Sequence, residues 1–217
     1  MSDVWSARAE AFRVSEPHRE GEDLDLVVEW CEPSEGITAL DVATGGGHVA
    51  RRLRKAGCAV VTVDPAPGMK PDVVSRAEDL PFADDSFDVV VCRIAAHHFP
   101  DVERAVAEMA RVSRRLLVID DLLFDGESVE EAHRLRDPTH VRSYTEEAWR
   151  KLVSVNGFEV EQLELLAERR LALEPWLDRV GVPADDRRRI RDLLGDATDG
   201  ETVRMPLLVL QARKPRS

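Results

Sequence analysis

The fold is decided by one stretch, Ala39-Leu40-Asp41-Val42-Ala43-Thr44-Gly45-Gly46-Gly47-His48-Val49-Ala50. It is an apolar run that ends in an acid, followed by three consecutive glycines and the start of a helical pattern. Glycine has no Cβ, so it adopts positive φ angles and lets a ligand approach the backbone closely. A helix that begins at such a turn presents unpaired N–H groups to the ligand. The stretch therefore predicts a strand, a binding turn and a helix at the mouth of a parallel sheet.

Strand and helix patterns alternate along most of the chain. Short apolar runs predict strands at 37–42, 59–63, 73–74, 88–92, 116–119, 158–166 and 203–212. Apolar residues at helical spacing predict helices at 3–13, 22–31, 48–56, 101–112, 145–156, 174–180 and 184–194. This alternation is typical of a parallel sheet covered on both faces. The predicted fold is α/β, a doubly wound sheet of about seven strands, mostly parallel, with an antiparallel C-terminal strand pair.

The amino-acid composition indicates which kinds of partner and which cellular compartment fit this chain. The formal net charge of −12 argues against a nucleic-acid partner, because phosphate binding needs a basic surface. The same acidic balance weakly favours a neutral or cationic small ligand. No apolar run approaches the ~18 residues that span a membrane, and the N-terminus has no signal-peptide pattern. Three cysteines without a CxxC pair predict reduced thiols in a cytoplasmic protein.

The glycine turn by itself leaves two ligands open. Residues 45–50 fit G-x-G-x-x-A, and Asp64 follows about twenty residues on, as in dinucleotide-binding proteins. A nicotinamide dinucleotide and a nucleoside sulfonium are equally compatible with this match. Asp41, four residues before Gly45, favours the sulfonium. Its carboxylate would repel a pyrophosphate and attract a cationic amino acid end.

Three later segments add a more specific signal. They are Ala77–Cys92, which contains Ala-Glu-Asp-Leu-Pro-Phe and Ser-Phe-Asp, then Arg93–Asp101 with His97-His98-Phe99, and Arg136–Arg142. In this order and spacing the chain resembles the class I S-adenosylmethionine-dependent methyltransferases, a Rossmann-like family. The resemblance is to the ubiquinone/menaquinone-biosynthesis type (methyltransferase domain family 11), and it covers about 20–157.

The resemblance implies S-adenosylmethionine as cofactor and methyl transfer to a small-molecule acceptor. It places these residues around the cofactor: Asp41, Ala43, Gly45, Gly47, Asp64, Pro65, Met69, Ala77, Glu78 and Arg93. Asp41 would lie near the amino end of the cofactor, and the backbone around Arg93 would hold its ammonium. Asp64 would accept both ribose hydroxyls. The implied organisation is one domain, 1–217, with a helical cap (1–34), a cofactor-binding core (35–170), a helical insertion (171–200) and a final strand (201–213).

The chain departs from the family pattern at three places. Ala43 replaces a glycine, and alanine is small enough for this position. Arg76 replaces an acid that accepts from the adenine amino group, and arginine has only donors, so Glu78, Asp79 or a backbone carbonyl must substitute. Residues 65–72, with three prolines and a glycine, replace a helix. We therefore expect one layer of the sheet to be thinned and the adenine site to be more open.

Methyl transfer by in-line displacement depends mainly on alignment, and a base is needed only when the acceptor must lose a proton. The candidates near the mouth of the sheet are His97, His98, His133, His140 and Tyr144. We select His98 first, because it follows the fourth strand directly, and His97 second. A packing or hydrogen-bonding role is the alternative for each. A metal site from the four histidines with Asp120 lacks tight spacing, so no metal is predicted.

The sequence also offers aromatic residues for an acceptor site, and it leaves two other functions open. The side chains that could cover the acceptor are Trp5, Phe12, Trp149 and Trp176, although Trp149 also fits a core position. One alternative function is non-catalytic binding of S-adenosylmethionine or S-adenosylhomocysteine. The other, less favoured, is an NAD(P)-dependent oxidoreductase.

Overall fold

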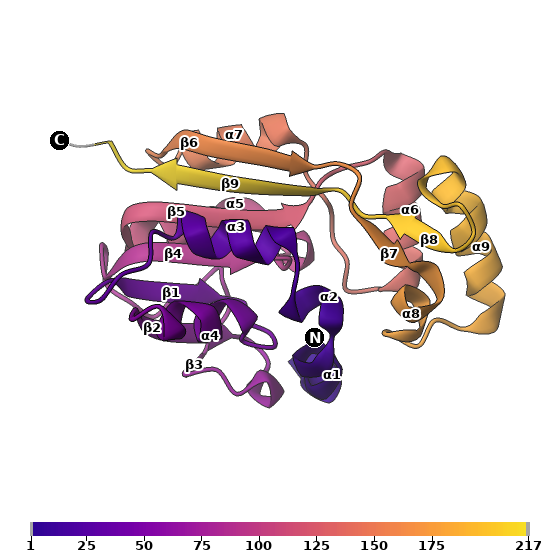
Figure 1. Ribbon diagram of the computed structural model, residues 1–217, viewed down its shortest axis with the longest axis horizontal. Coiled ribbons are helices and arrows are strands. Elements are labelled where there is room, and N and C mark those ends of the chain that lie inside the picture. The colour runs from indigo at the N-terminus through magenta and orange to yellow at the C-terminus, as the bar shows by residue number, and fades with distance from the viewer. Residues whose placement is uncertain (1, 216–217) are drawn as a thin grey trace.

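A seven-stranded sheet forms the framework of the protein (Figure 1). The computed structural model describes residues 2–215, and the side chains of all of these except 2, 3, 16 and 17. The sheet order is β3-β2-β1-β4-β5-β9-β6. Its strands are β1 (Thr38–Val42), β2 (Ala59–Asp64), β3 (Val73–Val74), β4 (Phe87–Arg93), β5 (Ser113–Leu122), β6 (Glu159–Leu166) and β9 (Leu207–Arg213). Strands β1 to β5 pair in parallel, whereas β9 is antiparallel to both β5 and β6. The predicted fold class is confirmed.

Helices cover both faces of this sheet. Helices α3 (Glu22–Trp30) and α4 (His48–Lys55) pack on one face, and α5 (Val102–Val112) and α7 (Glu146–Ser154) pack on the other. Alternate residues of β4 therefore enter different cores, with Val89 on the α3 side and Val90 on the α5 side. Trp149 is fully buried in the second core. It packs the sheet and does not cover a ligand.

Two helices begin where the sequence predicts, because a side chain caps each of them. The Asp101 carboxylate accepts from the backbone N–H of Arg104 at 3.0 Å, and the Thr145 hydroxyl accepts from that of Ala148 at 3.2 Å. Each bond satisfies an N–H that has no partner within the helix.

A smaller unit lies beyond one end of the sheet, at the right of Figure 1. It contains α6 (Glu127–Arg136), α8 (Leu173–Asp178), α9 (Ala184–Leu194), the 3-10 helix η3 (Gly195–Ala197), β7 (Arg170–Ala172) and β8 (Thr202–Arg204). Leu173, Trp176 and Ile190 belong to its separate core. Helix α6 was not predicted from the sequence. The predicted single strand over 203–212 is wrong, because the chain leaves the β7–β8 sheet and joins the main sheet as β9 only after Pro206.

The N-terminal helices α1 (Ser2–Val14) and α2 (Glu16–Arg19) form a lid over the carboxyl ends of the strands. The chain between β2 and β3 holds only the 3-10 helix η1 (Pro67–Met69), so the predicted lack of a long helix is confirmed. The expected opening of this side is wrong, because α1 packs on η1 and buries Ala66 and Met69 against Ala9. A Cβ on Gly68 would lie 2.6 Å from the Cα of Ser6, so only glycine allows this contact.

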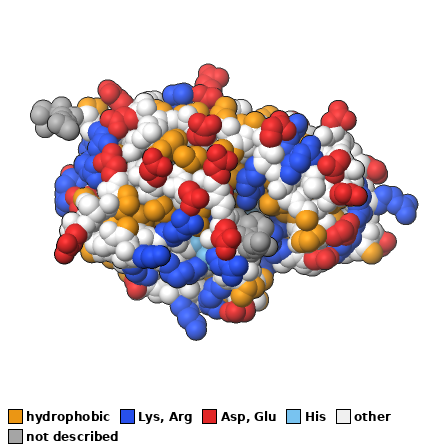
Figure 2. Space-filling view, viewed as in Figure 1, with side chains coloured by type: hydrophobic (Ala, Val, Ile, Leu, Met, Phe, Trp, Pro, Cys, Tyr) orange, Lys and Arg blue, Asp and Glu red, His pale blue; other side chains and the backbone are white. Residues whose placement is uncertain are grey.

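The remaining general features are the state of the cysteines, the surface charge and the character of the helices. Cys31, Cys58 and Cys92 are buried free thiols. Acidic and basic side chains are interspersed on the face shown in Figure 2. In the part of the chain that the structure describes, no helix has the length and apolar character needed to cross a membrane.

Candidate active site

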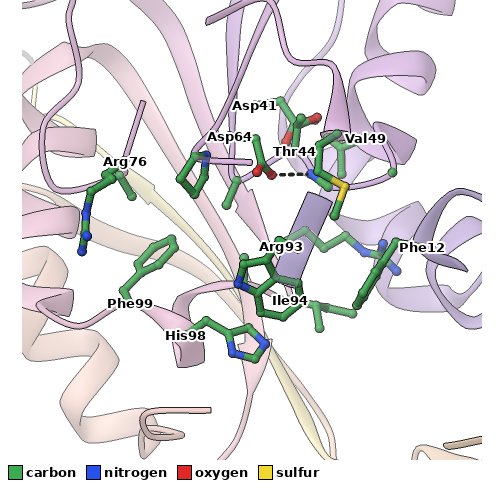
Figure 3. Close-up of a pocket in the computed structure, with 18 of the residues that line it drawn as sticks. Phe12, Asp41, Thr44, Val49, Asp64, Arg76, Arg93, Ile94, His98 and Phe99 are labelled. Carbon is green, nitrogen blue, oxygen red and sulfur yellow. Dashed lines mark hydrogen bonds between the residues drawn. The ribbon is translucent and has the colours of Figure 1, made fainter. Parts of the chain in front are cut away.

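A cavity of about 410 Å³ opens at the carboxyl ends of β1, β2 and β4, beneath the lid (Figure 3). The connections after β1 and β4 run to opposite sides at this point, which is where doubly wound sheets bind ligands. Ten of the twelve predicted site residues line it: Asp41, Ala43, Gly45, Asp64, Pro65, Met69, Ala77, Glu78, Arg93 and His98. Gly47 and His97 do not line it, which corrects their predicted placement.

The turn after β1 is held in place by Asp64. Its Oδ2 accepts from the N–H of Gly45 at 3.0 Å, and its Oδ1 accepts from the N–H of Ala66 at 2.9 Å (Figure 3). Each carboxylate oxygen has a second lone pair that can face the cavity. Gly47 caps α4 with φ 70° and supports the turn from outside the cavity.

Ala43 adopts a backbone conformation that suits the expected glycine better than alanine. Its φ is 55°, in the left-handed region that L-residues other than asparagine and aspartate rarely adopt. The sequence analysis considered only the volume of the alanine side chain. The structure shows that this position carries backbone strain at the mouth of β1.

Asp41 places a buried carboxylate below the turn. It accepts from the Thr44 hydroxyl at 2.6 Å and from the N–H of Ala50 at 3.2 Å. Burial raises the pKa of Asp41 to about 6, against the opposing effect of these hydrogen bonds, and burial also raises the pKa of Asp64. At neutral pH this end of the cavity is negative, which suits a cationic ligand group and disfavours a pyrophosphate.

Arg76, which replaces the acid of the family pattern, lies at the opposite end of the cavity. The Arg76 side chain is 54% exposed, and its guanidinium points away from the cavity (Figure 3). It lies 3.3 Å from Glu78, whose carboxylate is almost buried and lines the cavity. Asp79 is absent from the lining among the described residues. Glu78 is therefore the carboxylate placed to accept a hydrogen bond there.

Arg93 has a structural role that the sequence analysis missed. Its guanidinium donates to Asp23 from Nε at 2.9 Å and to the carbonyl of His18 at 2.8 Å. Its Nε also lies 3.3 Å from the Asp120 carboxylate. These contacts anchor α2 and α3 to the end of β4. The next residue, Ile94, has φ 48°, which is a marked outlier for a β-branched residue.

His98 lines the cavity as predicted, with its ring 4.6 Å from that of Trp5. Its Nδ1 lies 3.0 Å from the carbonyl oxygen of Thr139. A carbonyl only accepts, so Nδ1 carries the proton and Nε2 keeps a lone pair. Burial, reinforced by the neighbouring His97, lowers the pKa of His98. The ring is therefore neutral at physiological pH.

His97 lies behind His98 and is bound to Asp121. The Asp121 carboxylate accepts from the backbone N–H of His97 at 2.6 Å and lies 2.5 Å from its Nδ1. Burial raises the pKa of Asp121 to about 7 and lowers that of His97. This pair fixes the turn after β4 and positions His98.

A second, smaller cavity of about 70 Å³ adjoins the first. Both cavities are lined by Phe12, His18, Ile94 and His98, which form the junction between them. The rings of His97, His133 and His140 also gather around the smaller cavity. Within the described residues, no three histidine, cysteine or acidic side chains are arranged to hold a metal ion.

The comparisons with known proteins agree with this geometry. The family model described as "Methyltransferase domain" matches residues 40–116. YcgJ of Bacillus subtilis (strain 168), an uncharacterized methyltransferase, is 34% identical over 219 residues, which cover 90% of this chain and 85% of YcgJ. The chain is a class I S-adenosylmethionine-dependent methyltransferase. The family membership does not support the oxidoreductase or non-catalytic alternatives.

Solved methyltransferase-fold structures show the same architecture. The structure of B. subtilis YcgJ superposes with a TM-score of 0.78 at 28% identity and covers 90% of this chain and 99% of that one. The BH2331 protein of Bacillus halodurans C-125 gives a TM-score of 0.82 at 28% identity, over 90% and 100% of the two chains. Magnesium protoporphyrin IX methyltransferase of Synechocystis PCC 6803, solved with S-adenosylhomocysteine bound, shares the fold at 15% identity and a TM-score of 0.58, over 88% and 82%.

The methyltransferase cavity fits S-adenosylmethionine in size and in chemistry. A cavity of about 410 Å³ lies within the ~300–1,000 Å³ range of cofactor sites. Asp41 supplies a buried negative charge at one end, and Asp64 keeps acceptor capacity beside the glycine turn. Trp5 and Phe12 of the lid supply apolar surface. The individual contacts remain predictions.

Proposed function

We propose that this methyltransferase acts on a small-molecule acceptor by in-line displacement, and that the acceptor approaches from the smaller cavity. The observation that carries the proposal is the junction, since Phe12, His18, Ile94 and His98 line both cavities. A nucleophile held at this junction would face a methyl group presented from the larger cavity.

Different residues of the chain would have different roles in methyl transfer. S-adenosylmethionine, when bound, supplies an electrophilic methyl group on a sulfonium. Asp41 and Asp64 would hold its cationic and ribose parts, and Glu78 would accept from the adenine amino group. Trp5 and Phe12 would exclude water beneath the lid. The nucleophile and the methyl group would then be held in line without solvent between them.

His98 would accept a proton from the acceptor where the chemistry requires it. Its Nδ1 proton is directed to the carbonyl of Thr139, which leaves the Nε2 lone pair as the only basic site of the ring. His97 acts through its contact with His98, whose ring centroid is 4.1 Å away, and is a positioning residue.

The proposal is tested by separating binding from transfer. Calorimetry measures the affinity for S-adenosylmethionine and S-adenosylhomocysteine, and a labelled methyl group is followed into a panel of small oxygen, nitrogen and carbon nucleophiles. We expect His98→Ala to leave cofactor affinity within about threefold and to lower transfer by a factor on the order of 10²–10⁴ for an acceptor that loses a proton. Unchanged transfer in His98→Ala would remove the base assignment. Binding without transfer to any nucleophile would contradict the small-molecule proposal.

We also propose that the enzyme works in the cytoplasm. The support is the reduced state of its three buried thiols, which form no disulfide in the described structure.

A further inference from the structure

The smaller cavity is lined by three arginines from different parts of the chain. Arg136 ends α6, Arg169 lies in the turn between β6 and β7, and Arg179 follows α8. Burial lowers the pKa of all three, and that of Arg136 to about 9, which still leaves Arg136 protonated at neutral pH. Repulsion by Arg179 adds to the shift of Arg136, and repulsion by Arg169 adds to that of Arg179.

The lining contains little negative charge to offset these cations. Among the described residues that line the cavity, Asp137 is the one acid. Its carboxylate already accepts from Arg8 at 3.0 Å and from the hydroxyl of Thr139 at 2.7 Å. Asp23 and Asp120, which lie outside the lining, act on Arg169. The lining is therefore positive, although the whole chain has a net charge of −12.

Two of the arginines present donors to the cavity. The guanidinium carbon of Arg136 lies over the Trp176 ring, 4.3 Å from its centroid, and the Arg136 Nε donates to the Trp176 carbonyl at 3.0 Å. This contact leaves the two terminal nitrogens of its fork free of any hydrogen bond within the described structure. Arg179 has no hydrogen bond or ion pair to a described residue. Partly buried positive charge without a carboxylate partner is costly, and it is typical of sites that bind a charged ligand.

Four of the five histidines that line the smaller cavity do not add charge to it. Burial lowers the pKa of His18, His97, His98 and His133, so these rings are neutral at physiological pH. The Nε2 atom of His140 lies 3.1 Å from the carboxylate of Glu130 and is therefore already paired with an acid. The anion preference of the cavity therefore rests on the arginines.

We propose that the smaller cavity binds a carboxylate group of the methyl acceptor, with Arg136 and Arg179 as the specificity-determining residues. The identification as an acceptor site rests on the proposed function. A volume of about 70 Å³ accommodates a group on the order of five non-hydrogen atoms. A planar carboxylate matches the fork of a guanidinium, and the Trp176 contacts hold the Arg136 fork in place. The acceptor is thus a small carboxylic acid, which replaces the neutral or cationic ligand expected from net charge.

The test measures binding of simple acids to the protein saturated with S-adenosylhomocysteine. The probes are acetate, propionate and benzoate, each compared with its amide at matched ionic strength. We expect the acids, and not the amides, to raise the melting temperature and to give a measurable affinity by calorimetry. Arg179→Met should weaken acid binding by a factor on the order of ten to a hundred. Arg136→Lys, which keeps the charge and loses the fork, should weaken it less.

The controls separate this proposal from a general charge effect and from the proposed function. Arg188→Met removes an exposed arginine of α9 outside the cavity and should bind the acids like the unmodified protein. Affinity for S-adenosylhomocysteine should be unchanged in all three variants. Equal stabilisation by acids and amides, or equal acid binding by Arg179→Met, would overturn the proposal. Tighter binding of inorganic phosphate than of any acid would overturn the carboxylate assignment. Because the readout is binding, these results do not depend on whether His98 acts as a base.

Discussion

Arg8 donates from Nη1 to the Asp137 carboxylate at 3.0 Å, across 129 positions of the chain. Arg8 belongs to the lid, and Asp137 lines the smaller cavity just beyond α6. Trp5 and Phe12, from the same helix as Arg8, line the larger cavity. This ion pair therefore joins the lid to the wall of the smaller cavity, in addition to the packing of α1 on η1 beside the larger one.

We predict that Arg8→Met loosens the lid. The ion pair is mostly buried, so its loss should lower the free energy of unfolding by about 1 kcal/mol, and hydrogen exchange of residues 4–14 should become faster. Cofactor affinity should fall severalfold, because Trp5 and Phe12 are less well held. Glu10→Gln is the matched control, since Glu10 is an exposed residue of the same helix. Identical exchange in the two variants would show that the ion pair does not hold the lid.

Asp41→Asn should stabilise the free protein at neutral pH and weaken cofactor binding. The pKa of Asp41 is raised from 3.8 to about 6, so the folded state binds the proton more tightly than the unfolded state. Stability from this group is present at low pH and is lost as pH rises between about 4 and 6. Asparagine removes the cost of the buried charge, about 1–3 kcal/mol near pH 7. The two properties are measured by denaturant unfolding and by calorimetry.

The affinity of the unmodified protein for S-adenosylmethionine should decrease as pH falls through about 6, because protonated Asp41 no longer attracts a cation. The Asp41→Asn variant should lack this pH dependence. A parallel decrease in both proteins would assign the effect to another group.

Ala43→Gly should increase stability by up to ~1 kcal/mol without loss of cofactor affinity. Alanine at φ 55° is strained, whereas glycine adopts this conformation freely, and the greater entropy of glycine in the unfolded chain offsets part of the gain. Gly45→Ala, at φ 51° in the same turn, is the reverse experiment and should be destabilising. Urea unfolding of both variants measures the difference. A destabilised Ala43→Gly protein would mean that the alanine methyl group makes a packing contact that outweighs the strain.

Titration of His98 should not change the rate of methyl transfer at saturating cofactor between pH 8 and pH 5. Its pKa is lowered by burial, so the lone pair on Nε2 stays available when an exposed histidine would be protonated. The check is kcat measured over this range at saturating cofactor and acceptor. A decrease centred near pH 6.5 that disappears in His98→Asn would show that this ring titrates like an exposed one.

The sequence predicted many residues that line the larger cavity, because they are local in the chain. The turn at 43–47 follows β1 directly, and Asp64 ends the neighbouring parallel strand, so register alone brings them together. Arg76 was predicted to break the usual adenine contact, and the structure places Glu78 at the cavity in its stead. The strain at Ile94 has no sequence signal, and the strain at Ala43 is indicated only by the glycine that the family pattern has there.

The sequence could not predict the smaller cavity, which is the proposed acceptor site. His18, Ile94, Arg136 and Arg179 come from four distant elements and meet only because the lid and the unit beyond the sheet fold over the same edge. Helix α6 was missed because its exposed face is strongly charged and its apolar pattern is weak. Opening of the adenine side was wrongly expected, since nothing local shows that α1 packs on η1.

The sequence by itself determined the α/β architecture and the cofactor turn. Strand periodicity, helix caps and glycine conformation act over a few residues and do not need distant contacts. Only the tertiary structure decided the charge of the smaller cavity, the neutral state of His98 and the ion pair between Arg8 of the lid and Asp137. These properties depend on burial and on distances between segments far apart in the chain, and both exist only when the whole chain has folded.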